Sequence, residues 1–294
     1  MKPYHTVKTL IALILCTPAY SLWAAEVGSS TNTVFARDNL VAWCIVPFDA
    51  GKRGPQARAV MLQDLGIKKV AYDWRQEHIP TFEEEILAYK EHDLEYFAFW
   101  GWHASMESLV KKYGITPQIW QTNASPKTGT QDEKVKEASE RLMPLVEQTH
   151  KLGLKLGLYN HGAWGGEPKN LVAVCQWLRK YKRANHVGIV YNLHHGHEHI
   201  SDFAESLALM KSYLICLNLN GMNADAQPKI VPLGQGHHER PMLAVIAKSG
   251  YRGPIGILDH RSEIDAEESL KENLNGLKQI LREMGDLNTL KTFN

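Results

Sequence analysis

The stretch Gly188–Ile200, GIVYNLHHGHEHI, divides into an apolar half and a polar half. Its first four residues form an apolar run with Ile189 and Val190 at the centre, which is typical of a strand buried on both faces. From Asn192 onward, imidazole, amide and carboxylate side chains dominate. Parallel barrels and doubly wound sheets carry their chemistry at the carboxyl ends of their strands. We therefore expect a buried parallel strand that leads into a functional site.

Similar apolar runs recur along the chain, each followed by a polar turn and usually by a helical pattern. The eight runs are Leu40–Pro47, Lys69–Asp73, Leu94–Trp100, Pro117–Trp120, Leu154–Asn160, Val187–Asn192, Tyr213–Asn218 and Pro254–Asp259. Their spacing is mostly about 25 to 40 residues, the length of one βα unit. This rhythm predicts an α/β fold, a single-domain (β/α)8 TIM barrel, with a doubly wound open sheet as the alternative.

Glycine and proline positions support these element boundaries. Gly66, Gly153 and Gly250 each stand between a helical run and a strand-like run, where a left-handed residue ends a helix without a Cβ clash. Pro55 and Pro168 stand where helices are expected to begin, because proline is tolerated in the first turn.

Two helices are predicted in detail. The last has Leu270, Leu274, Leu277 and Leu281 on one stripe, and Asp265 with Glu268 is typical of a capping box at its start. Another is expected over Gln131–Lys151, where Pro144 should kink or divide it.

The chain opens with a predicted signal peptide over residues 1–25. Lys2 and Lys8 give a positive start, Leu10–Cys16 is a short apolar core, and Ala24 or Ala25 offers a small residue for cleavage. The apolar core is too short to span a bilayer, so no membrane partner is expected after cleavage. We expect residues 26–294 to form one exported domain, periplasmic or secreted.

The net charge and the cysteine content argue against a nucleic-acid partner and against a disulfide framework. Loss of two lysines with the signal peptide changes the formal charge from +1 to about −1, and no basic run remains, which argues against nucleic acid as a partner. Three cysteines, Cys44, Cys175 and Cys216, lie inside apolar runs of the mature chain. Their odd number is no disulfide framework, and we expect small buried hydrophobic residues.

Aromatic and amide side chains gather at the predicted strand ends. Five tryptophans occur there: Trp74, Trp100, Trp102, Trp120 and Trp164. An indole stacks on the C–H face of a sugar and donates one hydrogen bond. For any single tryptophan the interpretation as a cap of the barrel core is favoured, whereas the five together indicate a sugar platform at least as strongly. The amides at the ends of the fifth to seventh strands are Asn160, Asn192, Asn218 and Asn220. An amide both donates and accepts, which suits the neutral hydroxyls of a carbohydrate.

Histidines and acids form the third group at these strand ends. His161, His195 and His260 follow three different strands, and Glu167 and Asp259 are nearby acids. Imidazoles that converge can hold a divalent metal or act as acid and base. Asp73 and Arg75, after the second strand, are interpreted as a salt-bridged pair, with a substrate clamp as the alternative. His197 and His199 are expected to begin the next helix, and the His237–His238 loop could close over the site.

The segment from Leu152 to Leu281 resembles the xylose isomerase-like TIM barrel family of sugar isomerases and epimerases. The resemblance is carried by LGLYNHG, VGIVYNLHHGH, YLICLNLNGMN, LGQGHHE and GYRGPIGILDH, followed by the long final helix. In that family the sixth strand often ends in Asp with His three residues later, which Asn192 and His195 match here. The resemblance implies a TIM barrel that binds a small-molecule carbohydrate.

The chain departs from that family at the metal positions. The resemblance implies a divalent ion such as Mn²⁺, Co²⁺, Zn²⁺ or Mg²⁺, held in known members by two glutamates, an aspartate and a histidine. Asn160, Asn192 and Asn218 stand at the fifth to seventh strands instead, and only Asp259 keeps an acid. A neutral amide is a poor ligand and no base. A metal would therefore need a rearranged set drawn from His161, His195, Glu167 and Asp259.

These observations favour an exported isomerase or epimerase that abstracts a proton beside a sugar carbonyl. His195 or His161 is the expected base or ligand, with Asp259 as partner and a metal or imidazolium at the enediolate oxygen. A 3-keto-glycoside lyase on the same scaffold, or a sugar-binding protein without catalysis, remains an alternative. The endonuclease branch of the fold is disfavoured by the missing acids and the near-neutral charge. The sequence does not determine the oligomeric state.

Overall fold

The computed structural model describes Met1 and residues 34–294. Except for Met1, the predicted signal peptide over residues 1–25 lies outside the described residues. Within the described part of the chain, no helix has the length and apolar character needed to cross a membrane.

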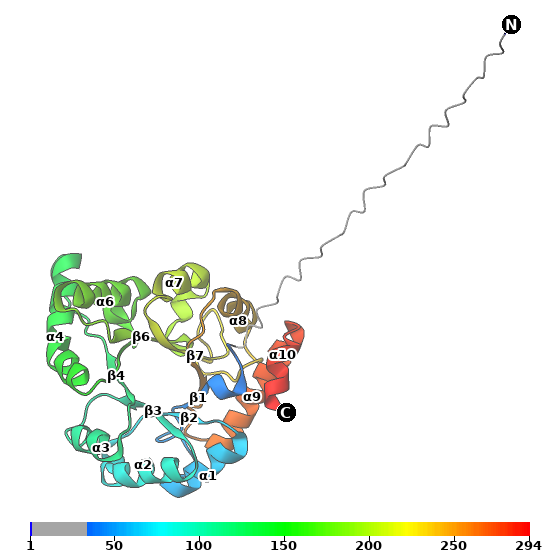
Figure 1. Ribbon diagram of the computed structural model, residues 1–294, viewed down its shortest axis with the longest axis horizontal. Coiled ribbons are helices and arrows are strands. Elements are labelled where there is room, and N and C mark those ends of the chain that lie inside the picture. Colours follow the sequence, from blue (N-terminus) through cyan, green and yellow to red (C-terminus); the bar gives the residue numbers. More distant parts are fainter. Residues whose placement is uncertain (2–33) are drawn as a thin grey trace. The chain divides into compact units, whose positions relative to one another are not determined.

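Eight parallel strands close into a barrel in which each strand pairs with the next along the chain (Figure 1). They are β1 (Leu40–Trp43), β2 (Lys69–Tyr72), β3 (Glu95–Trp100), β4 (Gln118–Thr122), β5 (Leu156–Tyr159), β6 (Val187–Asn192), β7 (Leu214–Leu219) and β8 (Ile255–Leu258). The ring closes between β1 and β8, where Leu40 pairs with Ile255 and Trp43 with Leu258. The predicted (β/α)8 barrel is confirmed. Each of the eight apolar runs coincides with a strand, although the fourth strand extends two residues further, to Thr122, and the seventh one residue further, to Leu219.

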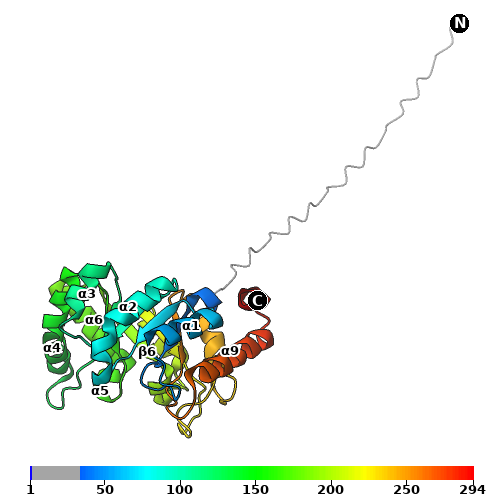
Figure 2. The same ribbon diagram turned by 90° about the horizontal axis from the view of Figure 1, so that it is seen from below.

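The helices surround this barrel. They are α1 (Pro55–Leu65), α2 (Phe82–Glu91), α3 (Met106–Tyr113), α4 (Gln131–Lys151), α5 (Ala163–Gly166), α6 (Pro168–Lys182), α7 (Phe203–Met210), α8 (Glu239–Lys248), α9 (Ala266–Glu283) and α10 (Leu287–Leu290). Short 3-10 turns are η1 (Arg37–Asn39), η2 (Gln76–Thr81), η3 (Leu193–His195), η4 (His197–His199) and η5 (Lys291–Phe293). The first and last long helices, α1 and α9, lie side by side (Figure 2).

The sequence signals at helix ends are mostly confirmed. Pro55 and Pro168 occupy the first turns of α1 and α6. Gly66, Gly153 and Gly250 have φ of 66°, 68° and 78°, the left-handed values expected after a helix.

Two predicted details of the helices differ from the structure. The helix α4 runs undivided through Pro144, because both Pro144 and Glu140 are exposed and the carbonyl freed by the proline can bind water. Asp265 caps α9 by accepting from the backbone N–H of Glu267, in place of the expected pairing with Glu268. Its carboxylate also accepts from Arg53.

The barrel interior is packed with aromatic side chains. Trp43 and Trp120 are fully buried there, with ring centroids 4.3 Å apart, and Trp100 meets Trp43 edge-on at 5.2 Å. Cys44 and Cys216 belong to the same inner cluster, whereas Cys175 packs between the sheet and the helices. All three thiols are buried, and none of the three forms a disulfide bond, as expected. This aromatic layer closes the barrel below the carboxyl ends of its strands.

Candidate active site

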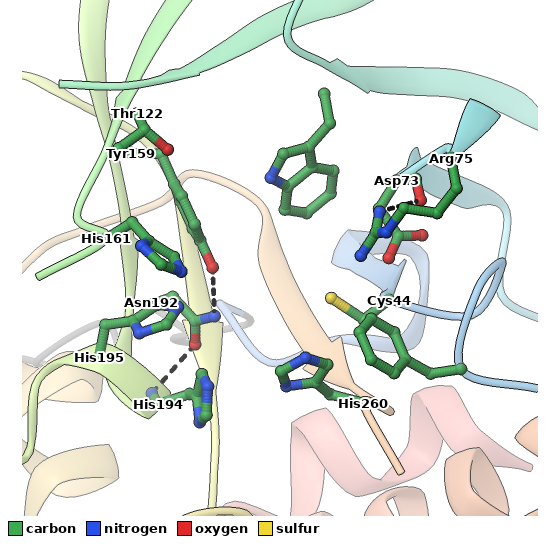
Figure 3. A pocket seen from close by; sticks show the side chains of 12 residues that line it. Cys44, Asp73, Arg75, Thr122, Tyr159, His161, Asn192, His194, His195 and His260 are labelled. Atoms are coloured by element: carbon green, nitrogen blue, oxygen red, sulfur yellow. Dashed lines mark hydrogen bonds between the residues drawn. The ribbon is translucent and has the colours of Figure 1, made fainter. Parts of the chain in front are cut away.

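A pocket of about 280 Å³ lies at the carboxyl ends of the strands (Figure 3). Its lining consists of Cys44, Phe48, Asp73, Arg75, Trp100, Thr122, Tyr159, His161, Asn192, His194, His195 and His260. These residues come from the ends of β1 to β6 and of β8, or from the loops that follow them. The active face expected from the sequence therefore carries a cavity built from most of the barrel strands.

Four histidines form one side of this pocket. The rings of His161 and His195 have centroids 4.5 Å apart, and those of His194 and His195 are 4.3 Å apart. His260 follows β8 and meets His194 edge-on at 5.0 Å. The structure thus brings together His161, His195 and His260 from three separate strand ends, and it adds His194.

Burial keeps the central imidazoles neutral. Burial, reinforced by the neighbouring imidazole of His260, lowers the pKa of His194 to about 3. Burial together with His194 and His161 lowers the pKa of His195 to about 2. Burial also lowers the pKa of His260. At neutral pH His194 and His195 therefore serve as uncharged hydrogen-bonding groups, not as imidazolium ions.

Asp73, Arg75 and Cys44 lie across the pocket from His161 and His195 (Figure 3). Burial raises the pKa of Asp73 to about 7, against the charge of Arg75 and the Cys44 thiol, which both lower it. Burial and the Asp73 carboxyl also raise the pKa of Cys44, so this thiol stays protonated at neutral pH. Asp73 is therefore a carboxyl that can change protonation state near pH 7.

Arg75 is oriented by the backbone. Its Nη1 donates to the carbonyls of Asp73 and Trp74, both at 2.9 Å, and its guanidinium lies 5.5 Å from the ring centre of Phe48. Among the described residues, no ion pair joins the carboxylate of Asp73 to Arg75, so the expected salt bridge is not formed. Both side chains line the pocket instead, which agrees with the alternative of a substrate clamp.

The strand-end asparagines form a network under the pocket. Asn160 Nδ2 donates to the carbonyl of Asn192, and Asn160 Oδ1 accepts from the Asn192 backbone N–H. Asn218 Nδ2 donates to Asn192 Oδ1, and Asn192 Nδ2 donates to the Tyr159 hydroxyl. Asn220 Nδ2 donates to the carbonyls of Gly221 and Lys229. Only Asn192 of these four lines the pocket, and the other amides hold strand ends and loops together.

The five tryptophans are likewise dispersed. Only Trp100 lines the pocket, and Trp120 is buried beneath it inside the barrel. Trp74 packs on Phe99 and donates to the carbonyl of Trp100. Trp102 packs against the outer core, and Trp164 donates to Gln131. The structure therefore does not assemble the expected tryptophan platform.

The expected metal ligands are also separated. Glu167 pairs with His199 at 3.2 Å and does not line the pocket. Asp259 is fully buried, and its carboxyl contacts the Ser269 hydroxyl of α9 and the backbone of Arg261. Only His161 and His195 of the rearranged set lie together in the pocket.

The donor set at the strand ends does not fit the divalent ion that the fold family implies. The amide of Asn160 is bonded to the backbone of Asn192, the Asn192 amide to Asn218, Tyr159 and the His194 backbone N–H, and Asn218 Nδ2 to Asn192. A neutral amide is also a poor ligand for such an ion. In residues 34–294, no group of three or more histidine, cysteine or acidic side chains is arranged to hold a metal ion. We therefore derive the chemistry of the pocket from the protein's own side chains.

Several residues that line the pocket were not predicted from the sequence. Cys44 lies in an apolar run, and its position at the pocket follows from the end of β1 and a positive φ of 60°. Tyr159 and Thr122 resemble ordinary strand residues, and only the length of β4 brings Thr122 to the rim. The strand-end rule that identified the histidines would have included Tyr159 as the last residue of β5.

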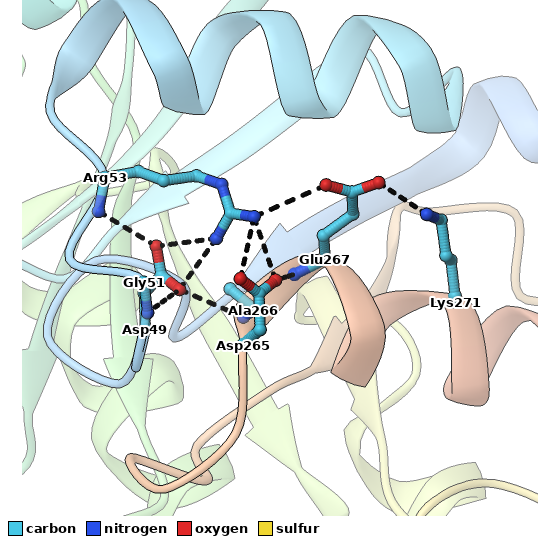
Figure 4. Close-up of polar contacts among 7 residues, drawn as sticks. All are labelled: Asp49, Gly51, Arg53, Asp265, Ala266, Glu267 and Lys271. Carbon is cyan, nitrogen blue, oxygen red and sulfur yellow. Dashed lines mark hydrogen bonds and ion pairs between the residues drawn. The ribbon is translucent and has the colours of Figure 1, made fainter.

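A network of charges fixes the loop that carries Phe48 (Figure 4). Asp49 accepts from the backbone N–H groups of Gly51, Arg53 and Ala266, at 2.9 to 3.1 Å. The Arg53 guanidinium bridges Asp49 to Asp265 at 2.9 Å. Burial opposes ionisation of Asp49, but these hydrogen bonds outweigh it and lower its pKa. The network joins the loop after β1 to the start of α9.

Replacing Asp49 by alanine is expected to destabilise the protein by about 2–4 kcal/mol, because buried N–H donors and one face of Arg53 lose their acceptor. Urea unfolding at pH 7 measures this change. Glu263→Ala, at an exposed position in the turn just before α9, is the matched control. The pKa of Asp49 is lower in the folded than in the unfolded state, so its ionisation stabilises the fold at pH values above the unfolded pKa. This contribution is lost as the pH falls through the folded pKa. The difference between wild type and variant should therefore shrink in acid, and a constant difference would contradict the assignment.

Comparison with known proteins agrees with this architecture. The model of the family described as xylose isomerase-like TIM barrel matches residues 106–280, more than half of the chain. The chain belongs to the xylose isomerase-like TIM barrel family. No curated protein sequence matches it significantly.

Solved structures similar to this chain share its fold at low sequence identity. They include the apo form of 3-keto-D-glucoside 4-epimerase from E. coli, at 14% identity and a TM-score of 0.58, covering 83% of this chain and 99% of that one. D-allulose 3-epimerase from Methylomonas sp. in complex with D-allulose has 12% identity and a TM-score of 0.62, covering 83% and 97%. The IOLI protein with a bound zinc atom has 12% identity and a TM-score of 0.64, covering 83% and 98%.

Proposed function

We propose that this protein is an exported enzyme of the sugar isomerase and epimerase type, which moves a proton beside the carbonyl of a carbohydrate. The observation that carries the proposal is the Asp73 carboxyl, whose pKa is raised to about 7 in a pocket that it shares with Arg75 and four histidines. A proton-transfer group works best when its pKa lies near the working pH. The named epimerases among the similar structures support the same class.

In the proposed reaction, ionised Asp73 takes the proton from the carbon next to the sugar carbonyl. The electron pair of that C–H bond forms the C=C bond of an enediolate, and the carbonyl oxygen becomes negative. The Arg75 guanidinium, which is always charged, stabilises this oxygen. His161, across the pocket from Asp73, returns a proton to the other face of the sugar. Once Asp73 has released its proton to water and His161 has regained one from water, the sum of these steps is an epimerisation. It is an isomerisation if the proton returns to the former carbonyl carbon while the hydroxyl on the neighbouring carbon passes its own proton to the negative oxygen.

This assignment revises the roles expected from the sequence. The sequence predicts His195 as base or ligand, but its pKa of about 2 makes its protonation costly at neutral pH. We assign His194 and His195 to hydrogen bonds with sugar hydroxyls. Asp73 replaces Asp259 as the acid of the site, because Asp259 faces Ser269 and does not line the pocket.

One observation favours a sugar-binding protein as the second candidate. The positions of the family's metal ligands hold asparagines that are bonded to one another, so that part of the usual machinery is replaced by structural amides. A binding protein of this kind would take up a sugar without exchanging a proton.

Proton exchange distinguishes the candidates. The purified mature chain is incubated in deuterated water with D-fructose, D-allulose, D-ribulose and a 3-keto-glucoside, and deuterium incorporation beside the carbonyl is followed by NMR. We expect incorporation with at least one of these sugars. Release of the aglycone from the keto-glucoside would indicate the lyase instead. Tight sugar binding without incorporation at any sugar would contradict the enzymatic proposal.

His161→Ala is expected to lower the exchange or epimerisation rate by about 100-fold, the lower end of the range for a lost general acid, because water can partly replace the donor. His150→Ala removes an exposed imidazole of α4 outside the pocket and is expected to leave the rate unchanged. Initial rates with the sugar selected above measure both variants. Equal rates for His161→Ala and wild type would remove His161 from the mechanism.

A further inference from the structure

A second cavity of about 330 Å³ adjoins the pocket and shares two of its residues, His194 and His195. Its lining consists of Gly162, Ala163, Gly166, Glu167, His194, His195, His197, Glu198, His199, Ala226, Gln227 and Lys229. These residues belong to the segments that follow β5, β6 and β7. One pair of neutral imidazoles therefore forms a wall common to both cavities.

His197, which lines this cavity and also a neighbouring one beside α8, has an unused hydrogen-bond acceptor. His197 is 9% exposed, and its Nδ1 lies 3.1 Å from the carbonyl oxygen of His194. A carbonyl oxygen only accepts, so Nδ1 carries the proton and Nε2 presents a lone pair. Among the described residues, this buried Nε2 has no hydrogen-bond partner. An unsatisfied buried acceptor is costly unless a ligand supplies a donor.

The lining of the cavity carries charged groups of both signs. The Glu167 carboxylate contacts His199 Nε2, while His199 Nδ1 contacts Asp202, both at 3.2 Å. Lys229 contributes one ammonium group and Glu198 a further carboxylate. Groups that accept and groups that donate are thus both available, without a large excess of one sign. Such a lining suits a neutral ligand rich in hydroxyl groups more than a phosphate or a cation.

Backbone strain marks the same place. Ala163 and Ala226 both line the cavity with φ of 52° and 54°, in the left-handed region that non-glycine residues rarely adopt. Residues held in such conformations cluster at ligand sites. The first pocket likewise has two non-glycine lining residues with positive φ, Cys44 at 60° and His260 at 75°.

We infer that the second cavity is a subsite for a second sugar ring, so that the substrate is a glycosidically linked carbohydrate and not a free monosaccharide. This inference rests on the proposed function. The reacting ring lies in the first pocket, between Asp73 and His161. The linked ring lies beyond His194 and His195, where a hydroxyl donates to His197 Nε2 and others donate to Glu167.

Calorimetric titration of the mature chain with D-glucose, maltose and cellobiose tests the subsite. We expect at least one disaccharide to bind about tenfold more tightly than glucose, the gain from one or two net hydrogen bonds. His197→Ala should lower the ratio of disaccharide to glucose affinity about tenfold. Gln227→Trp, which fills the cavity from an exposed position, should lower the same ratio even if His197→Ala fails to fold. His150→Ala, at an exposed position of α4 outside both cavities, is the matched control.

Two outcomes overturn the subsite: equal affinity of wild type for glucose and both disaccharides, or an unchanged ratio in the folded variants. The proton-exchange assay separates this failure from that of the proposed function. Disaccharide preference without exchange at any keto sugar would support the subsite and refute the enzyme. Exchange with free ketoses, together with no disaccharide preference, would refute only the subsite.

Discussion

Asp73→Asn is expected to lower the rate of proton exchange by about 10³- to 10⁴-fold, the upper part of the range for a lost general base. The amide has nearly the same shape as the carboxyl but cannot accept a proton. Sugar binding should survive, because Arg75 and the histidines are unchanged. The measurement compares kcat from exchange kinetics with the sugar affinity from calorimetry, in wild type and variant.

The pH profile supplies a second test of this assignment. Asp73 must be ionised to act as base, and its pKa is raised to about 7. In the wild type, kcat/KM should therefore rise about tenfold per pH unit as the pH approaches 7 from below. The neighbouring His194 and His195 titrate only near pH 3 and pH 2, so they add no limb in this range. A flat profile between pH 5 and pH 8, or full activity of Asp73→Asn, would exclude Asp73 as the base.

The same substitution should stabilise the fold at alkaline pH. The pKa of Asp73 is about 7 in the folded state and 3.8 in its unperturbed form, so the unfolded chain ionises first as the pH rises. Wild-type stability therefore falls between about pH 4 and pH 7, by up to roughly 4 kcal/mol for a shift of about three units. The Asp73→Asn variant lacks this loss, so it should gain stability relative to wild type across that interval. Urea unfolding at pH 4.5 and pH 8 measures the gain.

The fold was predictable because each βα unit carries its own local signals. Apolar runs predict the strands, and Gly66, Gly153 and Gly250 supply the left-handed helix ends that the structure shows. The exceptions are Pro144, whose effect depends on which side of α4 faces water, and Asp265, whose carboxylate also binds the distant Arg53. Local chemistry thus determines the barrel, and details that depend on tertiary contacts or on solvent escape it.

The site was predictable only in part, because a strand end specifies a position but not what the side chain contacts. The rule placed His161, His195 and His260 correctly in one pocket. It could not distinguish Asn192, which lines the pocket, from Asn160 and Asn218, which bond to it. It also could not reveal that Asp73 is buried enough to raise its pKa to about 7, since burial depends on residues distant in the sequence.

Arg75→Gln is expected to lower kcat by about 100- to 1000-fold, the loss measured when a group that stabilises a developing oxyanion is removed. Glutamine can still donate a hydrogen bond but carries no charge, so the enediolate loses its counter-ion. The neighbouring imidazoles cannot compensate, because burial keeps His194 and His195 neutral.

Arg75→Lys separates charge from geometry. Lysine keeps the charge but cannot donate at once to the carbonyls of Asp73 and Trp74 and to a substrate oxygen, as the forked guanidinium can. We expect it to recover part of the rate lost in Arg75→Gln, by about tenfold.

The loss of the positive charge also changes the pH profile. Arg75 lowers the pKa of Asp73, so the ascending limb of the profile should move to higher pH in Arg75→Gln and stay near its wild-type position in Arg75→Lys. A guanidinium that only supported the loop would reduce stability in both variants without moving that limb.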